Sequence, residues 1–121
     1  MMFSKQRTEI KRLKSKQTIE RLFSEGTSFG KRPLRLVCDT QKGNGLALGF
    51  GVSKRLFPKA VDRNRIKRLM REQYRHICSD PSYTPIEGNG FFIYTSQNLP
   101  SQVTIEKAMI PLVKHWINLQ P

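Results

Sequence analysis

The 121-residue chain carries 22 Lys and Arg against 9 Asp and Glu, a formal net charge of +13 at pH 7, and its length predicts one domain, residues 1–121, with a modest core. No apolar run approaches the roughly 20 residues that cross a bilayer, the basic N-terminus lacks the apolar segment of a secretory signal, and two cysteines, Cys38 and Cys78, without a CxxC pair are not typical of a zinc site or a disulfide scaffold. We therefore expect a cytoplasmic protein with reduced thiols that binds a polyanion, RNA or DNA in preference to an anionic membrane surface.

The positive charge is concentrated in the first part of the chain. Residues 1–75 contain 20 Lys and Arg against 6 Asp and Glu, whereas residues 76–121 contain 2 against 3. This division is typical of a binding surface carried on a near-neutral scaffold. Residues 1–14 show little periodicity, and we expect them to be a solvated tail or a segment that becomes ordered on nucleic acid.

A short helix is predicted between Ser15, a favourable N-cap residue, and Gly26, a favourable residue at a helix C-terminus. Three apolar residues recur at steps of three and four, which places them on one helical face: Ile19, Leu22 and Phe23. We expect this face to pack on the rest of the domain.

Two strands follow, at 33–40 and 46–53, and residues 27–30 can add a short further strand. The second strand has large apolar residues on one face and only small ones on the other: Ala47, Gly49, Gly51 and Ser53. Glycines within a strand often mark close approach by a ligand or by another part of the chain. Two interpretations stay open, a ligand against this face or tight packing of the short helix.

A basic helix is the strongest feature of the sequence. The run DRNRIKRLMREQYR, residues 62–75, holds six cations in fourteen positions. We expect the helix to begin near Pro58 or Asp62 and to end near Ile77. At 100° per residue, one stripe is apolar: Ile66, Leu69, Met70, Tyr74 and Ile77. The opposite face carries the amide and the cations: Asn64, Arg65, Lys67, Arg68, Arg71 and Arg75.

The last elements are a loop at 79–90, a buried strand at 91–95 and a long amphipathic helix capped by Ser101 or Thr104. Pro111 lies opposite the apolar stripe of that helix, and we expect it to kink or restart the helix. The element order predicts an α+β fold, an α/β sandwich in which helices pack over one face of a small mixed sheet.

The basic face predicts nucleic-acid binding. Like charges at i,i+4 repel by roughly a few tenths of a kcal/mol per pair, and most of these cations are arginines, whose planar guanidinium suits phosphate oxygens. The face has few base-reading side chains, and the chain has no helix-turn-helix or zipper pattern, so RNA binding by shape and backbone is favoured over DNA recognition. No carboxylates form a close pair, and neither His76 nor His115 has an evident catalytic partner, so we expect no catalytic residue and no metal ligand.

The run from FGVSKR through AVDRNRIKRLMREQYR resembles the RNR signature of the protein component of bacterial ribonuclease P. The segments SKQTIERLFSEGTS, LRLVC and GFFIYTSQNL resemble that family's first helix, central strand and last strand, so the likeness extends over most of residues 13–117. The resemblance implies an α-β-β-β-α-β-α order and a ribosomal protein S5 domain 2-like fold.

The resemblance also implies a function. The family is the protein subunit of an RNA-dependent endoribonuclease that removes the 5′ leader from precursor tRNA. It implies that the RNA subunit performs the chemistry with Mg²⁺, that the polypeptide binds no cofactor of its own, and that the protein is a monomer in a heterodimer with the ribonuclease P RNA.

Two surfaces follow from the resemblance. The surface for the catalytic RNA comprises Ser53, Lys54, Arg55, Arg63, Asn64, Arg65, Lys67, Arg68, Arg71 and Arg75. The cleft for the precursor leader, between the first helix and the sheet, comprises Ile19, Phe23, Val37, Ala47, Gly49 and Gly51. Of three positions where the family has an aromatic ring, this chain keeps only Phe23, because Ile19 and Val37 are aliphatic; only Phe23 can therefore stack on a base.

Three alternatives remain open at this point. The first is a structural, ribosomal-type RNA-binding protein with no part in cleavage. A DNA-binding regulator would need dimerisation and selective duplex binding. A self-sufficient nuclease is the least favoured, because the sequence offers no acid–base pair.

Overall fold

A computed structural model of the chain describes residues 10–41, 45–83 and 86–121. In chain order its elements are β1 (Ile10–Arg12), α1 (Lys16–Glu25), β2 (Thr27–Lys31), β3 (Leu34–Cys38), β4 (Leu46–Val52), α2 (Ala60–Cys78), β5 (Gly88–Tyr94) and α3 (Gln102–Leu119). The strands form one mixed sheet in the order β1-β4-β5-β3-β2. Strands β1, β4 and β5 are parallel, and β3 runs antiparallel to both of its neighbours.

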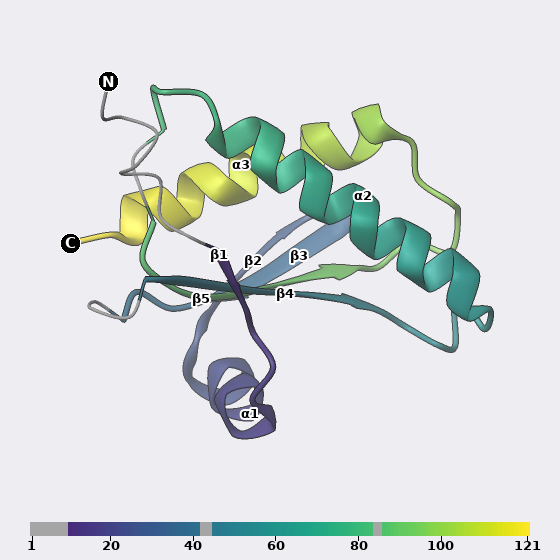
Figure 1. Cartoon of the computed structure of the whole chain (residues 1–121), viewed down its shortest axis with the longest axis horizontal. Helices are drawn as coiled ribbons and strands as arrows, with labels where there is room; N and C mark the ends of the chain where they lie inside the picture. Colours follow the sequence, from purple (N-terminus) through teal and green to yellow (C-terminus); the bar gives the residue numbers. More distant parts are fainter. Residues whose placement is uncertain (1–9, 42–44, 84–85) are drawn as a thin grey trace.

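Helices cover both faces of the sheet (Figure 1). Helices α2 and α3 lie side by side over one face, whereas α1 lies against the other and contacts β3 and β5. The α+β class and the α-β-β-β-α-β-α order are confirmed, but the expectation that all helices share one face is wrong. Val37 shows why, because this residue of β3 points away from α2 and α3 and is still only 6% exposed under α1.

The main core lies between the sheet and the pair α2 and α3, and it fixes which side of α2 faces outward. The α2 residues Ile66 and Met70 are 1% and 0% exposed, as the apolar stripe predicts. Trp116 of α3 is fully buried, and its Nε1 donates a hydrogen bond to the Asp39 carbonyl oxygen at 2.9 Å. Gly90 of β5 gives this indole its room, since a Cβ there would lie 2.4 Å from the ring.

The expected caps are confirmed for two of the three helices. Ser15 and Ser101 are the N-caps of α1 and α3, and their hydroxyls accept hydrogen bonds from the N–H groups of Thr18 and Thr104 at 3.3 and 3.2 Å. Helix α2 instead begins after Lys59, which makes no side-chain capping bond.

Helix α2 begins at Ala60, so the predicted start at Pro58 or Asp62 differs from it by two residues. Asp62 lies in the first turn of the helix, where its charge interacts favourably with the helix dipole without capping a specific N–H group. The sequence alone does not show whether an aspartate near a helix start caps an N–H group or lies within the first turn.

Pro111 does not restart α3, which is one continuous helix from Gln102 to Leu119. The proline removes the N–H that would bond the carbonyl of Lys107 four residues earlier. The helix continues through the proline without this bond.

Residues 10–13 are part of the fold, which corrects the expectation of a tail over residues 1–14; residues 1–9 lie outside the described part of the chain. Strand β1 pairs with β4 in the register Ile10↔Leu46 to Arg12↔Leu48. Leu13, 8% exposed, then packs with Leu22 and Val37 beneath α1. The burial of Leu13 holds this basic segment on the sheet.

The other strand boundaries agree with expectation within one or two residues, except at the start of β5. The short strand at 27–30 is confirmed as β2, which pairs with β3. Strand β5 begins at Gly88 and not at Phe91, because Gly88, Asn89 and Gly90 pair with the first residues of β4. The Asn89 N–H also donates to the Asp39 carboxylate, just after β3, at 2.8 Å. Gly88 has φ 128° and its Cβ would meet the Asp39 carbonyl oxygen at 2.2 Å, so the turn needs glycine.

Candidate nucleic-acid interface

The outer face of α2 is a basic surface that the exposed Glu72 interrupts. Asn64, Arg65, Arg68 and Arg75 are exposed, while Lys67 and Arg71 are half-buried. Their orientation follows from the apolar stripe on the opposite side, which is held in the main core. The structure thus places the predicted RNR-helix residues together on one side of the molecule.

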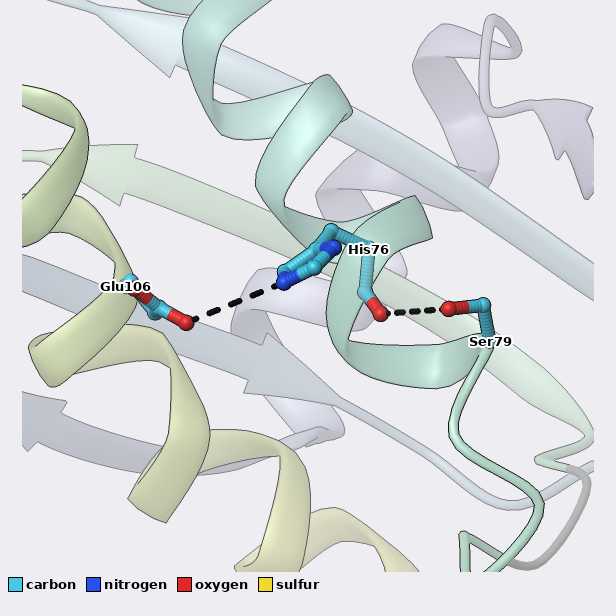
Figure 2. Close-up of polar contacts among 3 residues, drawn as sticks. All are labelled: His76, Ser79 and Glu106. Carbon is cyan, nitrogen blue, oxygen red and sulfur yellow. Dashed lines mark hydrogen bonds and ion pairs between the residues drawn. The ribbon is translucent and has the colours of Figure 1, made fainter.

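These cations are not neutralised by the protein itself. Within residues 10–41, 45–83 and 86–121, the one ion pair closer than about 4 Å joins His76 Nε2 and Glu106 Oε2, at 4.0 Å. Figure 2 shows that this pair connects α2 to α3, and that the His76 carbonyl accepts a hydrogen bond from Ser79 Oγ at 2.7 Å. The arginines on the outer face therefore keep their charge available for an external anion.

Arg63 has a different environment from the other predicted residues. It is half-buried, and its Nη1 donates to the carbonyl oxygens of Phe57 and Pro58 at 2.9 and 2.8 Å. These two bonds hold the loop that connects β4 to α2. The guanidinium thus has a structural role, and only its remaining donors can meet an anion.

The same loop presents the predicted residues at the end of β4. Ser53 Oγ accepts hydrogen bonds from the N–H groups of Arg55 and Leu56 at 3.1 and 3.4 Å. Lys54 and Arg55 are exposed beside the start of α2. The loop extends the basic surface beyond the helix.

Arg71 is held in place by an aromatic ring. Its Cζ lies 5.4 Å from the centroid of the Phe50 ring on β4, within the distance of a cation–π interaction. Beside it, a hollow of about 750 Å³ is lined by Arg12, Val61, Asn64, Arg65, Lys67, Arg68 and Arg71. The basic surface is thus concave beside Arg71 as well as positively charged.

The predicted leader-cleft residues fall into two groups. Ile19, Val37 and Ala47 pack with Leu13 and Leu22 in a small apolar cluster under α1. Phe23 is 48% exposed at the edge of that cluster. The structure therefore uses Ile19, Val37 and Ala47 for packing and leaves the Phe23 ring accessible.

Phe91 is the residue that the sequence reasoning missed. It lies on β5 opposite Val37 and Gly49, and a Cβ at Gly49 or Gly51 would approach its ring to 2.6 or 2.7 Å. The Phe23 and Phe91 rings meet edge to face, with centroids 5.4 Å apart. The small residues of β4 thus make room for the Phe91 ring of β5. The sequence had suggested a ligand or the short helix at this face, and it had not suggested this ring.

A signal for Phe91 was present in the sequence. Phe91 and Ile93 alternate with the core residues Phe92 and Tyr94, so Phe91 had to face the side of the sheet opposite α2 and α3. The missing information was that β5 is the neighbour of β4, which a strand pattern alone does not provide.

No group of three or more His, Cys, Asp or Glu side chains that could hold a metal ion occurs in the described segments. The described helices likewise include none that is long and apolar enough to span a membrane.

Comparisons with known proteins give a consistent result. A family model described as Ribonuclease P matches residues 8–115. The "Ribonuclease P protein component" of Porphyromonas gingivalis is 36% identical over 109 residues, which cover 84% of this chain and 80% of the relative. That of Clostridium kluyveri is 34% identical over 110 residues, covering 88% and 94%.

Solved structures share the fold. The RNase P protein of Staphylococcus aureus aligns with a TM-score of 0.70 at 25% identity, over 86% of this chain and 93% of that chain. The RNase P protein of Thermotoga maritima aligns with a TM-score of 0.73 over 87% and 96% of the two chains, and at 21% identity this likeness concerns the fold alone.

Proposed function

The chain belongs to the ribonuclease P protein family, and we propose that it works as the protein subunit of ribonuclease P, binding the enzyme's RNA subunit through the outer face of α2 and assisting removal of the 5′ leader from precursor tRNA. The single observation that carries the proposal is the row of arginines on α2, which have no acidic partner within the described residues and are flanked by Lys54 and Arg55. Guanidinium groups on a rigid helix suit the phosphates of a folded RNA.

We assign the hydrolysis to the RNA subunit, with Mg²⁺ held by the RNA. The contribution of the protein is positive charge at fixed positions, which offsets phosphate repulsion between the RNA subunit and the substrate. Such a contribution lowers the Mg²⁺ concentration that the reaction needs, and it requires no protein side chain at the reacting atoms. Ser53 and Arg63 act indirectly in this scheme, because their bonds shape the loop beside the basic surface.

We assign leader binding to the opposite face of the sheet. Phe23 and Phe91 offer adjoining aromatic surfaces at the edge of α1, and a base of a single strand stacks on such rings with about 1–3 kcal/mol. The small residues Gly49 and Gly51 act by giving Phe91 its position. The working unit in this proposal is one protein with one RNA, in the cytoplasm.

Cleavage of a precursor tRNA by its RNA subunit, with and without this protein, tests the proposal. At Mg²⁺ concentrations that barely support the RNA alone, we expect the protein to raise the rate. A double variant Arg65→Ala/Arg68→Ala should lose the stimulation, whereas the charge-matched Lys107→Ala/Lys114→Ala on α3 should retain it. Equal rates with and without the wild-type protein would refute the proposal, and co-sedimentation with ribosomal subunits would favour a structural ribosomal protein.

A further inference from the structure

A second basic groove lies at the edge of the sheet. Its cavity of about 600 Å³ lies between β1, the adjoining part of β4 and helix α2, and it also reaches Phe91 of β5. Five of its lining residues are cations, and none is acidic: Lys11, Arg12, Lys67, Arg71 and Arg75. We call it the β1–α2 groove; Lys11 and Arg12 of β1 belong to neither of the surfaces predicted from the sequence.

The β1 wall of the groove has a fixed position. Strand β1 pairs with β4 over three residues, and Leu13 N–H donates to the Leu48 carbonyl oxygen at 2.8 Å. Arg12 pairs in register with Leu48, a residue of the main core, so its side chain starts on the same face of the sheet as α2. The groove is continuous with the neighbouring hollow along α2, because four residues line both: Arg12, Asn64, Lys67 and Arg71.

The floor of the groove includes an open sheet edge. The ladder between β1 and β4 ends at Leu48, so in the described part of the chain β4 has no strand beside residues 49–52 on this side. Along a strand, the main-chain groups of every second residue point to the same edge. The Leu48 carbonyl points toward β1, where it accepts the Leu13 N–H. The N–H and C=O of Phe50, two residues later, therefore point into the groove. These groups can form hydrogen bonds with the edge of a base.

We propose that the β1–α2 groove binds an unpaired strand of RNA, with phosphates between Arg12 and the pair Lys67 and Arg71, and with one base against the open edge at Phe50. The proposal rests on the proposed function and adds a specific site to it. Cations on two facing walls suit a single phosphate backbone, and a cavity of this size is typical of a ligand of one or two nucleotides. A duplex keeps its base edges paired and offers none to the sheet edge.

The test measures binding of the intact protein to ribonuclease P RNA across a salt series. Removing one phosphate contact on a single strand reduces the slope of log K against log salt by about 0.7, so Arg12→Ala should bind more weakly and show that smaller slope. The matched control Lys107→Ala, an exposed cation on α3, should leave the slope unchanged. Because Arg12 is exposed, its variant should unfold at the wild-type temperature.

Competition identifies the occupant of the groove. A single-stranded RNA oligonucleotide should displace the RNA subunit from the wild-type protein more effectively than a duplex of equal charge, and Arg12→Ala should reduce that difference. Three results would overturn the proposal: a salt slope for Arg12→Ala equal to that of Lys107→Ala, equal competition by the duplex and the single strand, or equal competition by oligoglutamate. The last result would indicate that the groove binds an acidic peptide. Stimulation of cleavage by the wild-type protein separates these outcomes from failure of the proposed function.

Discussion

The contact between Gly49 and Phe91 shows how one small residue shapes a surface. A methyl group at Gly49 would lie 2.6 Å from Cδ2 of the Phe91 ring, so the ring must move away from β4. We expect Gly49→Ala to lower the free energy of unfolding by about 1–3 kcal/mol, the usual cost of overpacking, measured by urea denaturation. Gly30→Ala is the control, since its added Cβ would have no neighbour within 4 Å.

A double-mutant cycle identifies the cause of that loss. If the ring is responsible, adding Phe91→Leu to Gly49→Ala should cost less than the two single changes together, because contacting residues are not additive. Equal losses for Gly49→Ala and Gly30→Ala would contradict the role assigned to the glycine.

Cys38 makes stability depend on pH in the alkaline range. Burial, followed by the nearby Asp39 charge, raises the pKa of its thiol to about 12 from 9.0. The unfolded chain releases this proton near pH 9 and the folded chain retains it, so the stabilising contribution is complete below pH 9 and is lost between pH 9 and 12. The expected slope is about 1.4 kcal/mol per pH unit.

Comparison with Cys38→Val isolates this effect from other titrating groups. Denaturation of both proteins at a series of pH values should show a steeper alkaline decline for the wild type than for the variant. Parallel declines would mean that the Cys38 thiol ionises alike in the folded and unfolded chains.

At the scale of the element, α2 has two faces with separate tasks. Ile66 is 1% exposed in the main core, whereas Arg68 is exposed on the outer face. We expect Ile66→Ala to lower the free energy of unfolding by about 2–5 kcal/mol, and Arg68→Ala to change it by less than about 0.5 kcal/mol. Denaturation measures both, and similar losses would show that the faces are wrongly assigned.

The same two variants should separate in RNA binding. Arg68→Ala should weaken binding to the RNA subunit and reduce the salt slope by about 0.7–0.9, as expected for one lost phosphate contact. Ile66→Ala should retain the wild-type slope at temperatures where it is folded, because it removes no charge.

Local sequence patterns predicted most of the helices and strands, but they predicted the first and last residues of these elements less well. The apolar stripe of α2 and the capping serines Ser15 and Ser101 are local signals, and the structure agrees with them. Strand β1 and the position of Phe91 depend on which strands are neighbours, a long-range property that periodicity does not encode. The restart expected at Pro111 is absent, and Met109 and Leu112 on either side of the proline are both buried in the main core.

At the scale of the whole molecule, the sheet separates two binding surfaces. Helix α2 lies over one face, and α1 covers only part of the other (Figure 1). The arginines of α2 point outward, whereas Phe23 and Phe91 meet at the edge of α1. Phe91 also lines the β1–α2 groove, whereas Phe23 lines neither that groove nor the hollow along α2. A change at Phe23 should therefore leave binding at α2 intact.

Phe23→Ala tests this separation. Phe23 is 48% exposed and touches Phe91, and loss of base stacking on an aromatic ring costs about 1–3 kcal/mol. In the assembled enzyme, we expect this variant to reduce the preference for precursor over leaderless tRNA by roughly tenfold while its affinity for the RNA subunit stays at the wild-type value. Equilibrium binding of both tRNAs measures the preference.

The control for that experiment is Leu99→Ala, which also removes an exposed apolar side chain, 56% exposed, but from the segment before α3. It should leave the preference unchanged. Arg68→Ala should give the reverse pattern, with weaker assembly and an unchanged preference once the enzyme is saturated with protein. If Phe23→Ala impaired assembly as much as Arg68→Ala does, the two faces of the sheet would not act as separate surfaces, and leader binding would have to be placed elsewhere.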